Sequence, residues 1–184
     1  MDEHPMSDMK RRIIDSAQEF IQRNGYNGFS FRDIAAKVGI RSASIHHHFP
    51  TKSDLAAAVV RSYTDRVRHQ AAEFEASAMT PAEKLDWFAG FIKTTLTDDG
   101  KMCLCGMLGA ECNSLPPEVV RETAAFFKVT LGWLAGVLGG GKSGEQRARN
   151  FLASMEGALI LAKSLDDTAL LDTVSASAIR EALR

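Results

Sequence analysis

The chain has 184 residues, of which 45% are hydrophobic and 24% are charged, and its formal net charge is −1. This length suits one long domain or two small ones, and the hydrophobic content is enough for a buried core. The balanced charge excludes a global basic field, so any DNA-binding surface has to be a local one. The polar amino-terminal stretch lacks the apolar segment of a signal peptide, and no apolar run approaches the roughly 20 residues of a membrane span. The three Cys then suggest reduced thiols in the cytoplasm.

Evenly spaced apolar residues predict helices along the whole chain. The first expected helix covers residues 9–24, where Ile13, Ala17 and Ile21 repeat at helical spacing. No stretch alternates apolar and polar residues as a strand would, and the sequence contains no internal repeat. The pattern therefore indicates an all-α protein.

Residues 29–55 form the most informative stretch of the chain. Ser30 and Asp33 have the spacing of a capping box and start a short helix. Gly39 then stands where a helix-ending residue takes a positive φ. A second short helix is expected from about Ser42 to Phe49, and Pro50 ends it. Two short helices joined by a tight glycine turn are typical of the helix-turn-helix, whose second helix enters the DNA major groove.

The remaining sequence predicts six further helices, which brings the total to about nine. Four of them begin at a recognisable capping residue or proline. In chain order, Thr51 and Asp54 cap a long helix of roughly residues 52–77, Thr80–Pro81 starts another, a short helix lies near 102–113, Pro116–Pro117 opens one that extends to about Leu138, Ser143 and Gln146 cap one that extends to about Ser164, and the last spans roughly 168–183.

The helix-turn-helix segment resembles the DNA-binding region of TetR-family transcriptional repressors. The resemblance covers roughly residues 10–56, and beyond that the chain is similar to the family in length and helical character. It implies a three-helix bundle with the helix-turn-helix at residues 1–51 and a helical ligand-binding and dimerisation domain at residues 52–184. The long helix after residue 51 would then transmit movements between the two. The matching stretches are residues 29–35, 38–40, 45–49 and 52–55.

The resemblance implies which residues contact DNA. Ser and His can hydrogen-bond phosphates or base edges, and Arg can hold guanine through two hydrogen bonds. Phosphate contacts fix the register without specifying a sequence. The expected contacts of the second short helix are Arg41, Ser42, Ser44, His46 and His47, and the expected phosphate contacts are Lys52, Ser30 and Arg32.

Two positions depart from the family pattern. A small capping residue often stands where this chain has Arg41, so we expect the cap to shift to Ser42. The family usually has Tyr where this chain has His46, which leaves the operator sequence open and adds sensitivity to pH. The three consecutive His also permit two other interpretations, solvated polar residues or metal ligands. Consecutive residues point about 100° apart on a helix, so the three cannot ligate one ion, and we expect no metal and no cofactor.

The resemblance further implies a small-molecule effector site in the second domain. The candidate lining residues lie on helices expected around its middle, although each of them also fits a plain core role. The Cys-rich segment near Cys103 resembles one found in a subset of these repressors that sense electrophiles or unsaturated acids. Alternatively, these Cys are small buried hydrophobic residues. The candidates are Trp87, Phe88, Phe91, Cys103, Met107 and Phe127.

The last two expected helices carry broad apolar faces. Two such helices from each of two subunits can close as a four-helix bundle, which would make a homodimer. The alternative is that both faces are buried within one chain. The candidate interface residues are Phe151, Leu152, Met155, Leu159, Leu171 and Val174.

The sequence thus predicts a dimeric repressor that a small effector releases from a double-stranded DNA operator. One alternative keeps the DNA-binding module in a ligand-independent regulator or an activator. Another is a Cys-dependent enzyme, but no His follows His69 to act as the base that a Cys nucleophile needs. We therefore expect no enzymatic activity and no membrane partner.

Overall fold

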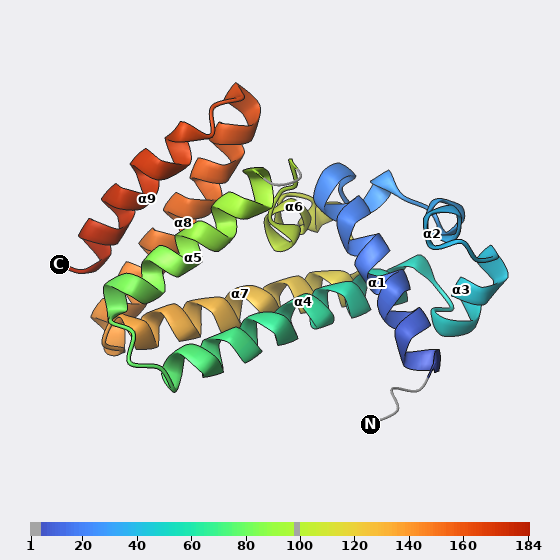
Figure 1. The fold of residues 1–184 in the computed structure, drawn as a ribbon, viewed down its shortest axis with the longest axis horizontal. Coiled ribbons are helices and arrows are strands. Elements are labelled where there is room, and N and C mark those ends of the chain that lie inside the picture. The colour runs from blue at the N-terminus through green and yellow to red at the C-terminus, as the bar shows by residue number, and fades with distance from the viewer. Residues whose placement is uncertain (1–4, 98–99) are drawn as a thin grey trace. The chain divides into compact units, whose positions relative to one another are not determined.

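The computed structural model describes residues 5–97 and 100–184, which form nine α-helices, two short 3-10 helices and no strand (Figure 1). The predicted all-α fold class is confirmed. Of the described helices, none combines the length and apolar character needed to cross a bilayer. In chain order the elements are α1 (Pro5–Asn24), η1 (Tyr26–Gly28), α2 (Phe31–Val38), α3 (Ser42–His48), α4 (Lys52–Glu75), α5 (Pro81–Thr97), α6 (Leu104–Ala110), η2 (Cys112–Ser114), α7 (Pro117–Val137), α8 (Gly141–Leu165) and α9 (Ala169–Ala182).

The helices pack into two compact units. Unit 1 comprises the chain up to Asp65 together with Leu104–Phe126, and unit 2 comprises Arg66–Cys103 together with Phe127–Arg184. The helices α4 and α7 therefore each contribute residues to both units. Packing does not follow the predicted boundary between residues 51 and 52, and the functional division at that boundary stays a prediction.

Local capping explains where the helices of unit 1 begin. At α2 the Ser30 N–H donates to the Asp33 carboxylate at 2.8 Å, and the Asp33 N–H donates to Ser30 Oγ at 3.3 Å. At α4 the Thr51 N–H donates to Asp54 at 3.0 Å, and the Asp54 N–H donates back to Thr51 Oγ1 at 3.1 Å. Both predicted capping boxes are confirmed, and each satisfies two backbone donors that a helix start leaves unpaired.

The expected cap of α8 is wrong. The helix begins at Gly141, with Gly140 as its N-cap residue, so Ser143 lies inside the first turn. Gly140 has a φ of 69°, which lets the chain reverse directly after α7. At Gly144 an added Cβ would lie 3.0 Å from the Ala135 carbonyl oxygen, so the start of α8 packs closely on the end of α7. Tertiary packing, rather than the capping residues, sets where this helix begins.

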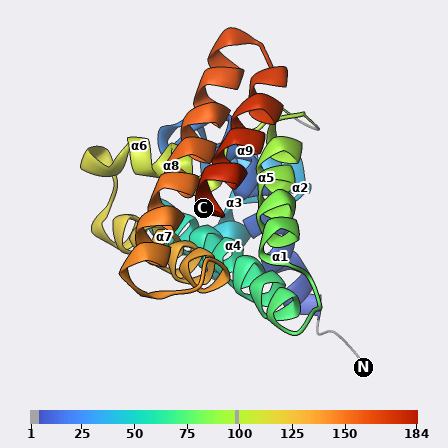
Figure 2. The same ribbon diagram turned by 90° about the vertical axis from the view of Figure 1, so that its left-hand side faces the viewer.

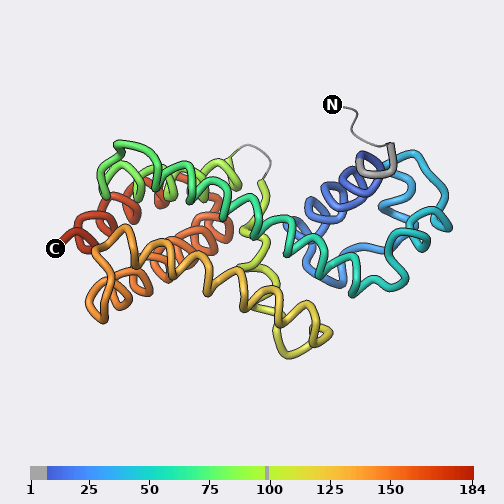
Figure 3. Tube along the Cα trace, turned by 90° about the horizontal axis from the view of Figure 1, so that it is seen from below, coloured from blue at the N-terminus to red at the C-terminus, as the bar shows by residue number. Residues whose placement is uncertain are grey.

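Apolar side chains from the first four helices form the core of unit 1. Four residues that are fully buried represent these helices in turn: Ile13, Ile34, Ile45 and Leu55. The chain path through α1 to α4 can be followed from blue to teal in Figure 3. Farther along α4, the Tyr63 ring packs at a tilt against Phe126 from α7, with 5.4 Å between ring centroids.

Unit 2 is built around α5, α8 and α9. The two helices α8 and α9 lie side by side in Figures 1 and 2 and pack on each other along their length. The core of unit 2 includes Phe151, Met155 and Leu159 from α8 and Leu171 from α9, each at most 1% exposed. An ion pair between Lys93 and Asp172 links α5 to α9.

Candidate nucleic-acid interface

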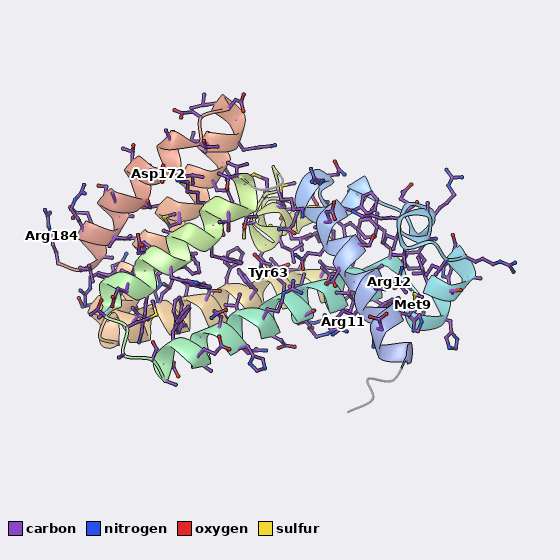
Figure 4. All side chains as sticks on the ribbon, viewed as in Figure 1. Met9, Arg11, Arg12, Tyr63, Asp172 and Arg184 are labelled. Atoms are coloured by element: carbon purple, nitrogen blue, oxygen red, sulfur yellow. The ribbon has the colours of Figure 1, made fainter. Side chains whose placement is uncertain are left out.

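The turn between α2 and α3 depends on Gly39. Its φ and ψ are 78° and 37°, and no described atom lies within 4 Å of a Cβ added there. The N–H groups of Gly39 and Ile40 both donate to the Ala35 carbonyl oxygen at 3.0 Å, which closes the end of α2. The guanidinium of Arg12, labelled on α1 in Figure 4, donates to the Val38 carbonyl oxygen at 2.9 Å. The predicted helix-turn-helix is therefore present, and α1 supports it.

Burial of one residue orients α3. Ile45 is fully buried and turns the opposite side of this short helix outward. That side presents four of the predicted DNA contacts as exposed side chains, and Ser42 is half-buried at the first turn. Ser30 and Arg32 are exposed at the start of α2. The exposed residues of α3 and its cap are Arg41, Ser44, His46 and His47.

The expected shift of the α3 cap to Ser42 is wrong. Arg41 itself is the N-cap residue, with an extended backbone at φ −82° and ψ 144°, and Ser42 is the first helical residue. The Arg41 side chain makes no cap hydrogen bond within the described part of the chain. The turn at Gly39 and the anchor at Ile45 fix the start of the helix without it. The Arg41 side chain is exposed.

The outer side of α3 borders a shallow groove of about 660 Å³. It combines hydrogen-bonding groups with apolar ones, as a surface that reads base edges and thymine methyl groups requires. Met9 of α1, labelled in Figure 4, lies at its border. The lining residues are Met9, Ile40, Arg41, Ala43, Ser44, His47 and His48.

His46 has a defined orientation. Its Nδ1 lies 3.3 Å from the Pro50 carbonyl oxygen, and its ring meets Phe31 edge-on at 4.6 Å between centroids. A carbonyl oxygen can only accept, so this contact places the proton of the neutral ring on Nδ1 and leaves Nε2 as an acceptor. Protonation would turn Nε2 into a donor suited to phosphate. His48, by contrast, is half-buried and tilts against Phe49.

Lys52 is engaged inside unit 1. Its Nζ donates to the Phe29 carbonyl oxygen at 2.7 Å and lies 4.4 Å and 4.8 Å from the ring centroids of Phe29 and Tyr26. Burial lowers the pKa of Lys52, while the charges of Glu111 and Asp33 raise it. An ammonium group has three donors, so the predicted phosphate contact would share Lys52 with this brace.

The candidate effector residues fall into both units. Met107 belongs to unit 1, and the other five belong to unit 2. In unit 2, Trp87 stacks on Phe91 at 5.7 Å between centroids, and Phe88 lies 6.0 Å from Trp133. Phe88 and Cys103 are buried, whereas the remaining four, Trp87, Phe91, Met107 and Phe127, are partly exposed.

A carboxyl group that the sequence prediction missed lies beside Cys103. Burial raises the pKa of Glu156, and a hydrogen bond from the Cys103 thiol partly offsets this rise. A single Glu inside the apolar stretch of residues 151–162 was the available signal. The three thiols, Cys103, Cys105 and Cys112, are not in disulfides, and Cys112 alone of them is exposed. Among the described side chains, no group of three His, Cys, Asp or Glu is placed to hold a metal ion.

The candidate interface residues form the core of unit 2 within a single chain. Five of them are at most 5% exposed, and Val174 is half-buried, as in the alternative in which both faces pack inward. The outward side of α8 instead exposes Ile160, Leu161 and Leu165 at 51%, 52% and 64%. In the sequence, these three residues lie on a second apolar face of the same helix. The five buried residues are Phe151, Leu152, Met155, Leu159 and Leu171.

Comparison with known proteins identifies the class to which this architecture belongs. The family model described as "Bacterial regulatory proteins, tetR family" matches residues 13–59. A TetR transcriptional regulator from Legionella pneumophila is 33% identical, with 98% of this chain and 99% of that chain covered and a TM-score of 0.90. A TetR-family regulator from Agrobacterium tumefaciens is 32% identical, with 95% and 97% covered and a TM-score of 0.88. The chain therefore belongs to the TetR family of transcriptional regulators.

A curated relative matches a short part of the chain. It is the HTH-type negative transcriptional regulator IcaR of the Staphylococcus aureus biofilm operon icaADBC, which is 40% identical over 47 residues. The match covers 26% of this chain and 25% of that protein. The likeness to this relative thus covers about a quarter of each protein.

Proposed function

We propose that this TetR-family regulator is a homodimeric repressor that binds a pseudo-palindromic DNA operator and is released by a small-molecule effector. One observation carries the proposal: the exposed polar side of α3, which Ile45 and the Gly39 turn hold away from the core. A regulator of bacterial genes works on chromosomal DNA, so we place the protein in the cytoplasm. We propose no catalytic role.

Direct contact with DNA is assigned to the α3 side chains and their neighbours. Arg41 has an exposed guanidinium that matches the acceptor pair of guanine, and Ser44, His46 and His47 follow it on the same helix. Ser30, Arg32 and Lys52 would contact phosphates. In a two-fold dimer, two such helices meet half-sites about one DNA turn apart or a multiple of it.

A gel-shift assay on DNA upstream of the gene for this protein and of its neighbours tests the proposal. We expect retardation that weakens as salt rises, because each phosphate contact releases counterions. Arg41→Ala should weaken specific binding about tenfold or more, since a good bidentate base contact contributes roughly 1–3 kcal/mol. Lys142→Ala, which removes an exposed charge at the start of α8, serves as control. Absence of binding to any duplex would refute the proposal.

The effector class is tested by adding small compounds to the same assay. If the effector is an unsaturated electrophile, the Cys103 thiol loses its proton and the sulfur adds to one carbon of the double bond, whose π bond breaks while the other carbon takes up a proton. Cys103→Ser should then lose the response. Cys112→Ser is the matched control because that thiol is exposed. A compound that releases DNA from both variants would act without Cys103. Unchanged DNA binding with every compound would favour the ligand-independent alternative.

A further inference from the structure

Two charged side chains hold the turn between α1 and α2. Glu111, which directly follows α6, accepts a hydrogen bond from the Tyr26 N–H at 2.9 Å. Lys52, the first residue of α4, donates to the Phe29 carbonyl oxygen and covers the rings of Tyr26 and Phe29. All of these residues belong to unit 1. The turn that leads into the helix-turn-helix is therefore bound by both α4 and the segment after α6.

Glu111 occupies space that a side chain at Gly25 would fill. A Cβ added to Gly25 would lie 2.0 Å from Glu111 Oε1. Gly25 also has φ 74° and ψ −177°, a conformation that is nearly restricted to glycine. Gly140 has almost the same backbone, with φ 69° and ψ −168°, but no described atom lies within 4 Å of its added Cβ. The close approach of the carboxylate is thus specific to Gly25.

Other contacts dock the same segment onto α4. Glu122 forms an ion pair with Arg61 at 2.7 Å, and a hydrogen bond from Ser53 lowers the pKa of Glu118. These contacts are made along α4, whereas Glu111 reaches the turn before α2. Phe29 and Ser30 follow that turn directly and lead into the capping box of α2. A shift of Glu111 would therefore be passed to the start of the helix-turn-helix.

We propose that Glu111 is a positioning residue for DNA binding, which fixes the turn of residues 25–28 and so sets how α2 and α3 are presented. The inference rests on the proposed function, because it takes the α2–α3 module to be the DNA-binding surface. The negative charge of Glu111 also raises the pKa of Lys52 against the effect of burial, and so favours the ammonium form that braces Phe29.

Glu111→Ala gives the decisive measurement, because a pure charge effect and the loss of a positioning contact predict opposite changes in DNA affinity. Loss of a negative charge from a DNA-binding unit should by itself strengthen binding to a polyanion. Loss of a positioning contact should instead weaken operator binding, by about tenfold for one charge-assisted hydrogen bond. Glu145→Ala, which removes an exposed charge on α8, is the control. The Tyr26 amide should also exchange its hydrogen faster, which NMR of the labelled protein measures without DNA.

Four further variants distinguish loss of the Glu111 contact from general destabilisation of the fold. Glu111→Gln keeps an oxygen acceptor for the Tyr26 N–H, so amide protection and operator affinity should recover to within about threefold of wild type. Gly25→Ala should weaken operator binding by displacing the carboxylate. Gly140→Ala imposes similar backbone strain without a clash and should leave operator binding nearly unchanged. In the Glu111→Ala background, Gly25→Ala should cost less than it does in wild type.

The outcomes are distinguishable. A wild-type protein that binds no duplex would refute the proposed function itself. A wild-type protein that binds, together with a Glu111→Ala variant that binds equally well or better, would overturn the positioning role alone. Unchanged exchange of the Tyr26 amide in that variant would also overturn it.

Discussion

Glu156 has an environment that disfavours its charged form. It stands on α8 within a mostly apolar stretch, beside the Cys103 thiol, and burial raises its pKa. A carboxyl group removed from water favours its neutral form. The ordinary pKa of a Glu side chain, which applies in the unfolded chain, is near 4.5. The folded chain therefore holds the Glu156 proton at pH values where the unfolded chain has released it.

This difference predicts a pH effect of definite sign on stability. The contribution of Glu156 is fully present below the unfolded pKa and is lost as the pH rises through the raised, folded pKa. Glu156→Gln should remove that loss. The free energy of unfolding, measured in urea, should therefore decrease less with rising pH above about 4.5 in the variant than in wild type. Glu145→Gln, at an exposed position on the same helix, should follow the wild-type profile. Parallel profiles for wild type and Glu156→Gln would contradict the prediction.

At the scale of the element, the helix-turn-helix depends on the backbone at Gly39. Its left-handed conformation ends α2, and no described atom would meet an added Cβ, so the cost of a substitution comes from the backbone. Gly39→Ala should lower the free energy of unfolding by about 1–2 kcal/mol, because L-residues disfavour this conformation by that amount. Gly39→Asn should cost less, since Asn tolerates it better. Urea unfolding of the two variants tests this order, and equal loss in both would count against it.

The same scale shows why some helix boundaries were predictable. Ser30, Thr51 and Gly39 act on residues within a few positions along the chain, and each predicted role is present in the structure. The predicted caps at Ser42 and Ser143 failed because packing against other elements set those starts. Ile45 anchors α3 in the core, and Gly144 brings α8 against the Ala135 carbonyl oxygen. The capping pattern around a helix start does not reveal such packing contacts.

For the whole molecule, long-range pairing was the part that the sequence did not reveal. Residues 104–126 belong to the predicted effector domain, yet they pack in the unit that contains the helix-turn-helix. The contact between Glu111 and Tyr26 joins residues that are 85 positions apart, and nothing in the neighbourhood of either residue points to the other. The DNA-facing residues were accessible to prediction because they lie within one contiguous motif.

At this scale the apolar faces of α8 decide where the proposed homodimer would form. The inward face is used within one chain, whereas Ile160, Leu161 and Leu165 are about half exposed or more. In a two-fold interface each residue is buried twice. Complete burial of an exposed Leu contributes about 1.5–3 kcal/mol, and Leu161 is already half buried within one chain, so this position accounts for roughly 1.5–3 kcal/mol per dimer. A carboxylate at position 161 would also lie near the same carboxylate of the second copy, and the two negative charges would repel each other.

Leu161→Glu should therefore convert a dimer into monomers at micromolar concentration and weaken operator binding, since two half-sites need two linked heads. Analytical ultracentrifugation measures the association, and a gel shift measures the affinity. Lys142→Glu, at an exposed position on the same helix, should leave both unchanged. Because Leu161 is 52% exposed, urea unfolding of the monomer should change little, which separates lost association from lost folding. A Leu161→Glu protein that sediments as a dimer would place the interface on another surface.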